Sequence, residues 1–244
     1  MPVHFIDPAT GPYQLPTAWR EVTTKQYLDL SREQLLTVGQ AAEYFAGRPV
    51  EVTDFVAAAL SWLGEPPPTE GGRPYPAVGE GTYQQVESIR KLLAQQPLHQ
   101  CFCQVYGLLQ GRWHNGAREF RQGWASRLAA YCADYPITDT YPAVAACLAQ
   151  LHDYFKPDGG PFYALTLPDE TEAGRKAQQA GSERLNSFGY LNVASEYAQR
   201  WGQMPDTVLA MPWLSMMIYL LRDREVAQVQ ENLTKQTSPK NQHD

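Results

Sequence analysis

The chain has 244 residues, a formal net charge of −6 and 43% hydrophobic residues, which suits one large or two small folded domains. This acidic balance excludes a global electrostatic attraction to nucleic acid or to anionic membranes. No apolar run reaches the length of a membrane span and the N-terminus does not resemble a signal peptide, so we expect a cytoplasmic protein.

The N-terminal part of the chain predicts short helices with polar caps. Met1–Tyr13 contains several Pro and Gly residues and is expected to be extended. Thr23 or Thr24 is expected to cap a first helix, and a second start near Ser31 leads to a helix that ends at Gly47. Thr53 is expected to cap a third helix.

A break follows, because residues 65–82 are dense in Pro and Gly. Such a composition does not permit a continuous helix or a central strand. We therefore predict a linker or a long surface loop here, with a short extended piece at Tyr75–Val78.

Helical periodicity resumes at Tyr83 and recurs along the rest of the chain. The predicted helices run from Tyr83 to Pro97, Leu98 to Leu109, Phe120 to Asp134, Tyr141 to Phe155 and Ser182 to Trp201. Phe162–Leu167 alternates weakly and is predicted to be extended, and the polar segment Asp169–Gly181 is predicted to be a solvated helix or a loop.

The last helix is the most apolar part of the chain. Its apolar residues recur at positions i, i+3, i+4, i+7 and i+8, namely Trp213, Met216, Met217, Leu220 and Leu221. Leu214 and Ile218 form a second stripe beside this one. So much apolar surface indicates that the helix is largely buried or that part of it is kept for a partner.

The preceding helix carries an aromatic stripe with the same two interpretations. Tyr190, Val193, Tyr197 and Trp201 describe either plain helix packing or a protein-binding groove, since Tyr, Trp and Met are favoured at interfaces. The candidate partner-binding residues are Tyr190, Tyr197, Trp201, Trp213 and Met217.

Residues that could support catalysis or metal binding are sparse. His99, Cys101 and Cys103 resemble a metal cluster, but a helix turns Cys101 away from the other two, and a strand leaves the fourth ligand of a structural zinc site missing. The sequence contains no GxSxG, Walker or GxGxxG motif. The four cysteines are expected to be reduced thiols in a core. We expect no catalytic residue, no cofactor and no metal site.

One basic stretch interrupts the acidic chain. Its candidate nucleic-acid-binding residues are Arg112, Arg118, Arg121, Trp124 and Arg127. Arginines interleaved with Trp can hold phosphates and stack bases. The same pattern describes a helix that buries Trp124 and leaves its arginines solvated, and the net charge makes a nucleic-acid partner unexpected.

Two segments resemble a known group of proteins. Leu15–Leu30 (LPTAWREVTTKQYLDL) and Phe188–Leu221, together with Thr82-Tyr83-Gln84-Gln85, are similar to small helical proteins encoded in the tail modules of tailed phages and prophages, especially those of Bacteroidetes hosts. Such proteins are often assigned as tail assembly chaperones. The resemblance implies a non-enzymatic protein of the bacterial host cytoplasm that binds a helical partner, such as the tape-measure protein.

Together these patterns predict a mainly α fold, an irregular multi-helix bundle with a long Pro/Gly-rich loop and little or no strand. The expected organisation is an N-terminal helical segment at 1–64, a linker at 65–82, a main helical domain at 83–233 and a disordered tail at 234–244. A structural connector or baseplate adaptor of a phage-like particle, and a nucleic-acid-associated helical protein using Arg112–Arg127, remain the alternative functions.

Overall fold

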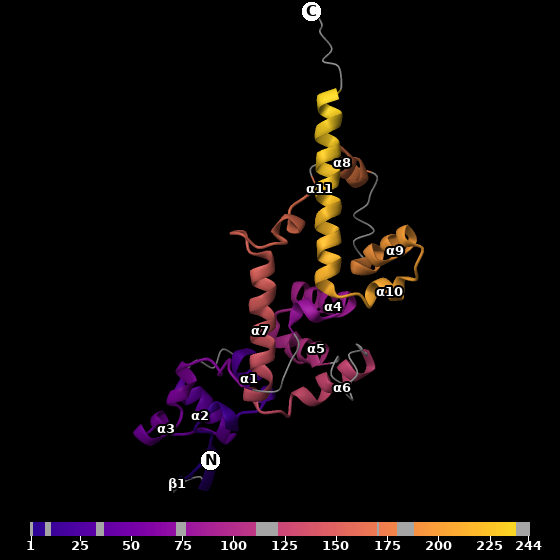
Figure 1. The fold of residues 1–244 in the computed structure, drawn as a ribbon. Coiled ribbons are helices and arrows are strands. Elements are labelled where there is room, and N and C mark those ends of the chain that lie inside the picture. The colour runs from indigo at the N-terminus through magenta and orange to yellow at the C-terminus, as the bar shows by residue number, and fades with distance from the viewer. Residues whose placement is uncertain are drawn as a thin grey trace, which may run out of the picture. The chain divides into compact units, whose positions relative to one another are not determined.

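The described part of the chain is mainly helical, and the only sheet within it is a two-stranded hairpin (Figure 1). The computed structural model describes residues 2–7, 11–32, 37–71, 77–110, 122–169, 171–179 and 188–237. The predicted fold class is therefore confirmed. Within the described residues, no helix is both long and apolar enough to cross a membrane.

The N-terminal residues form an antiparallel hairpin. Strand β1 (Val3–Asp7) pairs with strand β2 (Gly11–Leu15), so that Val3 lies opposite Leu15. The sequence predicted extended backbone here but not the pairing, because five-residue strands carry too little alternation to show a register. Leu15, at the end of β2, is fully buried and joins the hairpin to the N-terminal core.

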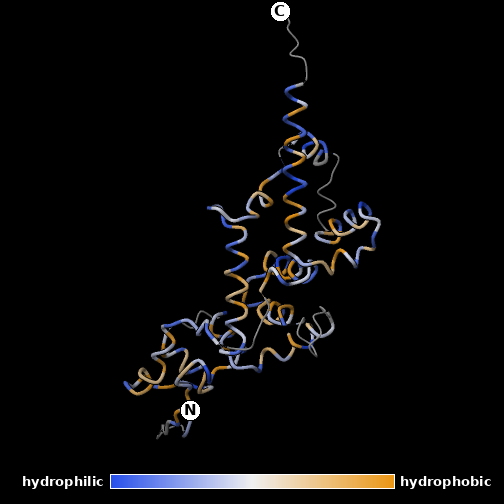
Figure 2. The backbone as a smooth tube through the Cα atoms, viewed as in Figure 1, coloured by the Kyte–Doolittle hydropathy of each residue, from blue (hydrophilic) through white to orange (hydrophobic). Residues whose placement is uncertain are grey.

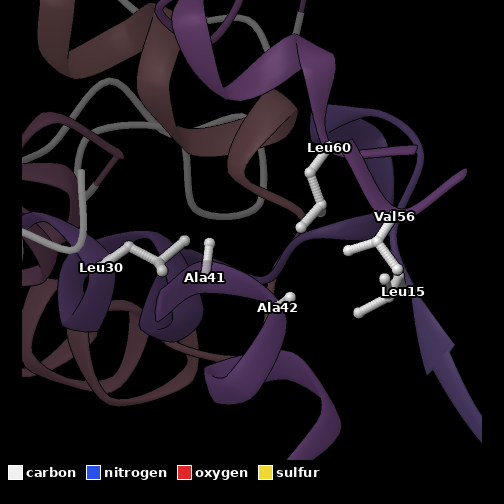
Figure 3. Packing of buried hydrophobic residues seen from close by; sticks show 6 residues of the cluster. All are labelled: Leu15, Leu30, Ala41, Ala42, Val56 and Leu60. Atoms are coloured by element: carbon white, nitrogen blue, oxygen red, sulfur yellow. The ribbon is translucent and has the colours of Figure 1, made fainter. Parts of the chain in front are cut away.

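Short helices follow the hairpin and enclose a small core. They are η1 (Trp19–Glu21), α1 (Thr24–Arg32), α2 (Val38–Ala46), α3 (Asp54–Ala59) and η2 (Ser61–Gly64). Their core residues, shown in Figure 3, are Leu15, Leu30, Ala41, Ala42, Val56 and Leu60. The predicted cap of α3 is correct, since the Thr53 hydroxyl accepts from the Val56 N–H. The Thr37 hydroxyl caps α2, whose predicted start falls partly on residues outside the described range.

Two helices begin with the same reciprocal cap. The Thr23 hydroxyl accepts from the Gln26 N–H at the start of α1, and the Gln26 side chain accepts from the Thr23 N–H at 2.9 Å. Thr82 and Gln85 repeat this exchange at the start of α4 (Tyr83–Gln95). Each pair satisfies two N–H groups that a helix start leaves without intrahelical partners.

Three further helices follow α4, namely α5 (Leu98–Gln110), α6 (Gln122–Cys132) and α7 (Ile137–Phe155). Helix α7 begins four residues before the predicted Tyr141. The Ile137 N–H donates to the Val22 carbonyl at 2.9 Å, and the Thr140 hydroxyl bonds that of Thr24 at 2.8 Å. These contacts join residues far apart in sequence, which is why local periodicity did not predict the boundary.

The remaining elements are η3 (Val78–Glu80), η5 (Tyr163–Thr166), α8 (Glu172–Gln179), α9 (Tyr190–Trp201), α10 (Pro205–Leu209) and α11 (Trp213–Thr237). The prediction that Phe162–Leu167 is extended is wrong. Phe162 is buried and its N–H donates to the Tyr154 carbonyl, so the segment turns as a 3₁₀ helix. The first half of the extended piece predicted at Tyr75–Val78 lies outside the described residues, and Val78 begins η3. The predicted start of α9 at Ser182 also lies outside them.

The chain divides into two compact units. The first comprises Met1–Pro76 and Ser88–Leu148, and the second comprises Ala77–Glu87 and Ala149–Asp244. The predicted segment 1–64 lies within the first unit, whereas the predicted range 83–233 is divided between the units, because α4 and α7 each contribute residues to both. The first four residues of the predicted tail, 234–237, continue α11, and residues 238–244 lie outside the described range.

Candidate protein-binding surface

The base of α11 is anchored by backbone bonds in the second unit. The Trp213 N–H donates to the Gly81 carbonyl and the Tyr83 N–H donates to the Met211 carbonyl, both at 2.8 Å. Thr82 and Pro212 form an antiparallel bridge between these bonds. The segment before α4 therefore holds the start of α11 through paired main-chain groups, which fix its position more strictly than side-chain packing alone.

Aromatic rings surround the first residue of α11. The Trp213 ring meets those of Tyr154, Phe155 and Phe162 in edge-on arrangements, with centroids 5.1, 6.1 and 5.8 Å away. Its indole N–H donates to Glu87 Oε1 at 2.9 Å. A fully buried Trp needs such an acceptor, because an unsatisfied indole N–H in a core is costly.

One side of α11 is therefore core. Trp213 and Met216 are fully buried and Met217 is 2% exposed, and we call these three residues the inner face. Trp213 and Met217 were predicted to bind a partner. Their burial makes them packing residues, since neither side chain reaches the surface. Leu220, which the stripe pattern predicted beside them, is only half-buried.

The predicted aromatic residues of α9 pack against neighbouring elements of the same unit. The half-buried Trp201 ring lies between those of Tyr197 and Tyr219, at 4.9 and 5.1 Å. The half-buried Tyr190 ring meets the Tyr83 ring edge-on at 6.3 Å. The aromatic stripe is thus mainly helix packing in this structure.

A group of polar side chains joins α9 to α11. It consists of Tyr197, Arg200 and Asp223, and we call it the polar lock. The buried Tyr197 hydroxyl donates to Asp223 Oδ2 at 2.6 Å, and Arg200 forms an ion pair with the same carboxylate. Burial and the adjacent Asp223 carboxylate raise the pKa of Tyr197. The hydrogen bond from Tyr197, helped by Arg200, lowers the pKa of Asp223. Both groups are therefore held in the protonation states that the bond requires.

The inner side of α11 is also covered farther along the helix. Arg224 donates to the carbonyls of Leu167 and Pro168 at 2.8 and 3.0 Å, and the Glu172 N–H at the start of α8 donates to Glu231 at 3.0 Å. Figure 1 shows α8 beside this part of α11. Arg224 and Glu231 are seven residues apart and thus share one side of the helix with Met217.

A second apolar face of α11 is exposed. Ile218, Val226 and Val229 are 54%, 44% and 55% exposed, and we call these three residues the outer stripe. Leu214, 36% exposed, lies beside Gly79 of η3 and is partly covered. Because each residue advances the helix by about 100°, Val226 and Val229 point roughly opposite to Arg224 and Glu231. Figure 2 shows hydrophobic stretches recurring along α11 among hydrophilic ones. Leu233, 55% exposed, continues the spacing.

The outer stripe is the candidate functional site. The predicted second stripe contained Leu214 and Ile218 but not Val226 and Val229. The missed signal was the spacing of three and four residues from Val226 through Val229 to Leu233, which continues an apolar side into a polar segment. Aliphatic side chains exposed in such a row mark a surface suited to another helix.

Most of the predicted nucleic-acid set falls outside the described part of the chain. Arg112, Arg118 and Arg121 lie outside it. Trp124 is half-buried and Arg127 is exposed on α6.

The possible metal ligands are separated as well. Cys101 is buried and its thiol contacts the Pro97 carbonyl at 3.7 Å, whereas the Cys103 thiol contacts that of Cys132. Among the described residues, no group of three His, Cys, Asp or Glu side chains is placed to hold a metal ion.

The first unit has two cavities of similar size. One of about 380 Å³ lies beside α1 and the start of α5 and is lined by Lys25, Asp29, Arg32 and His99. The other, of about 360 Å³, lies among α4, α5 and α6 and is lined by Lys91, Gln95, Gln104 and small or apolar residues. Its one ionisable lining group does not form the paired acid and base that a catalytic site needs.

Comparison with known proteins adds no relative: no protein-family model, curated protein or solved structure matches this chain.

Proposed function

We propose that this protein is a non-enzymatic binding protein that docks a helical partner segment along the outer stripe of α11. The observation that carries the proposal is that α11 is apolar on two sides and that, among the described residues, the inner side is buried whereas the outer stripe is exposed. The resemblance to phage tail-module proteins extends this proposal. It implies an assembly factor in the host cytoplasm whose partner is a helix-forming chain such as the tape-measure protein.

The energetics favour a helix as the occupant. A partner helix with apolar residues at a three-and-four spacing would interdigitate with Ile218, Val226 and Val229 and remove their exposed surface from water. The base of α11 is already fixed by Trp213 and its backbone bonds. Docking therefore requires little ordering of α11 itself, which leaves more of the burial energy for affinity.

The two phage-related functions, assembly factor and particle component, differ in whether the partner is bound transiently or permanently. An assembly factor must release its partner, whereas a connector or baseplate adaptor of a particle retains it. The outer stripe has a small apolar area and is flanked by polar residues such as Gln228 and Gln230. Such a surface suits reversible binding, because obligate interfaces are larger and more apolar.

Co-expression with a helix-forming tape-measure protein of a tailed phage tests this proposal. We expect a soluble complex on size exclusion that persists at physiological salt, because apolar burial is not screened by ions. Val229→Lys should abolish the complex. The matched control Gln228→Lys, which adds the same charge one position away, should retain it.

Both variants should keep the melting temperature of the unmodified protein, since both side chains are exposed. Retention of the complex by Val229→Lys would refute the outer stripe as the binding surface. A complex that also stays bound throughout assembled particles would favour the connector function.

A further inference from the structure

Two helices of the first unit approach each other unusually closely. A Cβ atom added at Gly107 on α5 would lie 2.3 Å from the Ala125 carbonyl oxygen and 2.9 Å from the Ala129 nitrogen on α6. These distances are far shorter than real Cβ contacts, so the backbones of α5 and α6 touch at this glycine. Any larger residue would push the two helices apart.

Two thiols meet one turn away from that contact. Cys103 lies four residues before Gly107 on α5, and Cys132 lies three residues after Ala129 on α6, so the helices run antiparallel past each other. The close helix approach at Gly107 therefore places Cys103 and Cys132 opposite each other, and the pKa of each thiol is shifted by the other. Opposed positions on two helices whose backbones touch suit the short separation that a disulfide spans.

The two cysteines differ in accessibility and acidity. Cys103 is partly exposed, whereas Cys132 is fully buried. The neighbouring Cys132 thiol lowers the pKa of the Cys103 thiol, and the Cys103 thiol together with burial raises the pKa of Cys132. Cys103 is thus the thiol that an oxidant reaches first and the one that more readily forms the nucleophilic thiolate.

We propose that Cys103 and Cys132 form a redox-modification site that closes into a reversible disulfide between α5 and α6 when the protein meets a peroxide. The Cys103 thiolate attacks one peroxide oxygen, the O–O bond breaks and hydroxide leaves, giving a sulfenic acid. The Cys132 sulfur then attacks the Cys103 sulfur, the S–S bond forms, and the S–O bond breaks. The leaving hydroxide takes up the Cys132 proton. Two thiols are oxidised and one hydrogen peroxide is reduced to two waters.

Cys132 lies at the junction of α6 and α1. It is the last residue of α6; its carbonyl accepts from the Tyr135 N–H at 3.2 Å, and the neighbouring Ala133 carbonyl accepts from the Lys25 N–H of α1. The Cys132 side chain contacts Thr24, whose hydroxyl donates to the Tyr135 carbonyl. The disulfide therefore braces the junction where α1 meets the end of α6, and it closes the long connection between Cys103 and Cys132 into a loop.

The other two cysteines provide the contrast. Cys101 is buried and its thiol contacts the carbonyls of Gln96 and Pro97, and burial raises the pKa of Cys147 to about 12. Both should react with peroxide much more slowly than Cys103.

Peroxide treatment of the folded full chain, followed by alkylation in denaturant and peptide mapping, tests the proposal. We expect loss of two thiols, a mass lower by two hydrogen atoms, and a cross-link between the peptides carrying Cys103 and Cys132. Oxidation should raise the melting temperature by roughly 5 °C or more, and dithiothreitol should reverse it.

Variants separate this pair from general thiol oxidation. Cys103→Ala should form no cross-link and show no peroxide-dependent rise in melting temperature, whereas the matched control Cys101→Ser should behave as the unmodified chain. Circular dichroism of the reduced variants checks that each one folds. Sulfinic acid at Cys103 without a cross-link, a cross-link through another cysteine, or no reaction would each overturn the proposal.

Discussion

Both faces of α11 are apolar, but they differ in their surroundings. The inner face, Trp213, Met216 and Met217, packs against rings of α7 and the segment after it, whereas the outer stripe is exposed along the same helix. Met217 and Ile218 are adjacent in sequence, yet the first is 2% exposed and the second 54%. Hydrophobicity thus identifies the apolar sides of a helix, but neighbouring elements decide which side becomes core and which remains available.

The strongest test of the inner face is Trp213→Ala. We expect it to destabilise the protein by about 3–5 kcal/mol, because it removes a fully buried ring and leaves a cavity among three other aromatic rings. Chemical denaturation followed by circular dichroism measures this change. A loss below about 1 kcal/mol, typical of surface positions, would contradict the placement of Trp213 in the core.

Met217→Ala should come next, with a cost of about 2–5 kcal/mol. Leu220→Ala removes a comparable side chain from a half-buried position and should cost less. The same denaturation experiment compares the two variants. Equal losses would show that the boundary of the inner face lies one turn farther along α11.

Tyr197→Phe tests the lock between α9 and α11. It removes the hydroxyl that donates to Asp223 at 2.6 Å and should cost about 1.5–3 kcal/mol, the range for a hydrogen bond to a charged group. The ring and its packing against Trp201 remain in this variant. Unchanged stability would mean that water replaces the hydroxyl without penalty.

Acid should weaken the same lock. The pKa of Asp223 is lowered in the folded protein, so its stabilising contribution is present above its ordinary value, about 3.9, and is lost as the pH falls through the lower folded value. Urea denaturation of the unmodified chain and of Tyr197→Phe, measured from neutral pH down into this acidic range, isolates the contribution. The variant should lose less stability on acidification, and parallel curves would exclude this bond as the cause.

The smallest effect on stability is expected for Ile218→Ala. The change should stay within about 0.5 kcal/mol because the side chain is already more than half exposed. It should nevertheless weaken capture of a helical partner. A clear loss of stability would place Ile218 in a packing role and remove it from the proposed surface.

The candidate surface was only partly accessible to sequence reasoning. The aromatic and Met residues of α9 and α11 were the natural candidates, since such residues are favoured at interfaces. The structure buries Trp213, Met217 and Tyr197. Rings of this size contribute most when fully buried, so a fold with partners available will use them in its core. Exposed branched residues such as Val226 and Val229 are what remain for an external helix.

The sequence by itself determined the local features of this protein. The helical character, the Thr53 cap, the Thr23–Gln26 cap and the ends of helices at Gly47 and Gly202 depend on interactions within a few residues. Both glycines adopt positive φ, which residues with a Cβ rarely tolerate, so their role is readable without the fold.

Only the tertiary structure decided the rest. The start of α7 at Ile137, the turn at Phe162 and the choice between the two faces of α11 each depend on residues far away in the chain. The physical reason is that a short segment carries its own capping and periodicity. The burial of its side chains and the satisfaction of its remaining N–H and C=O groups depend on which other elements fold against it.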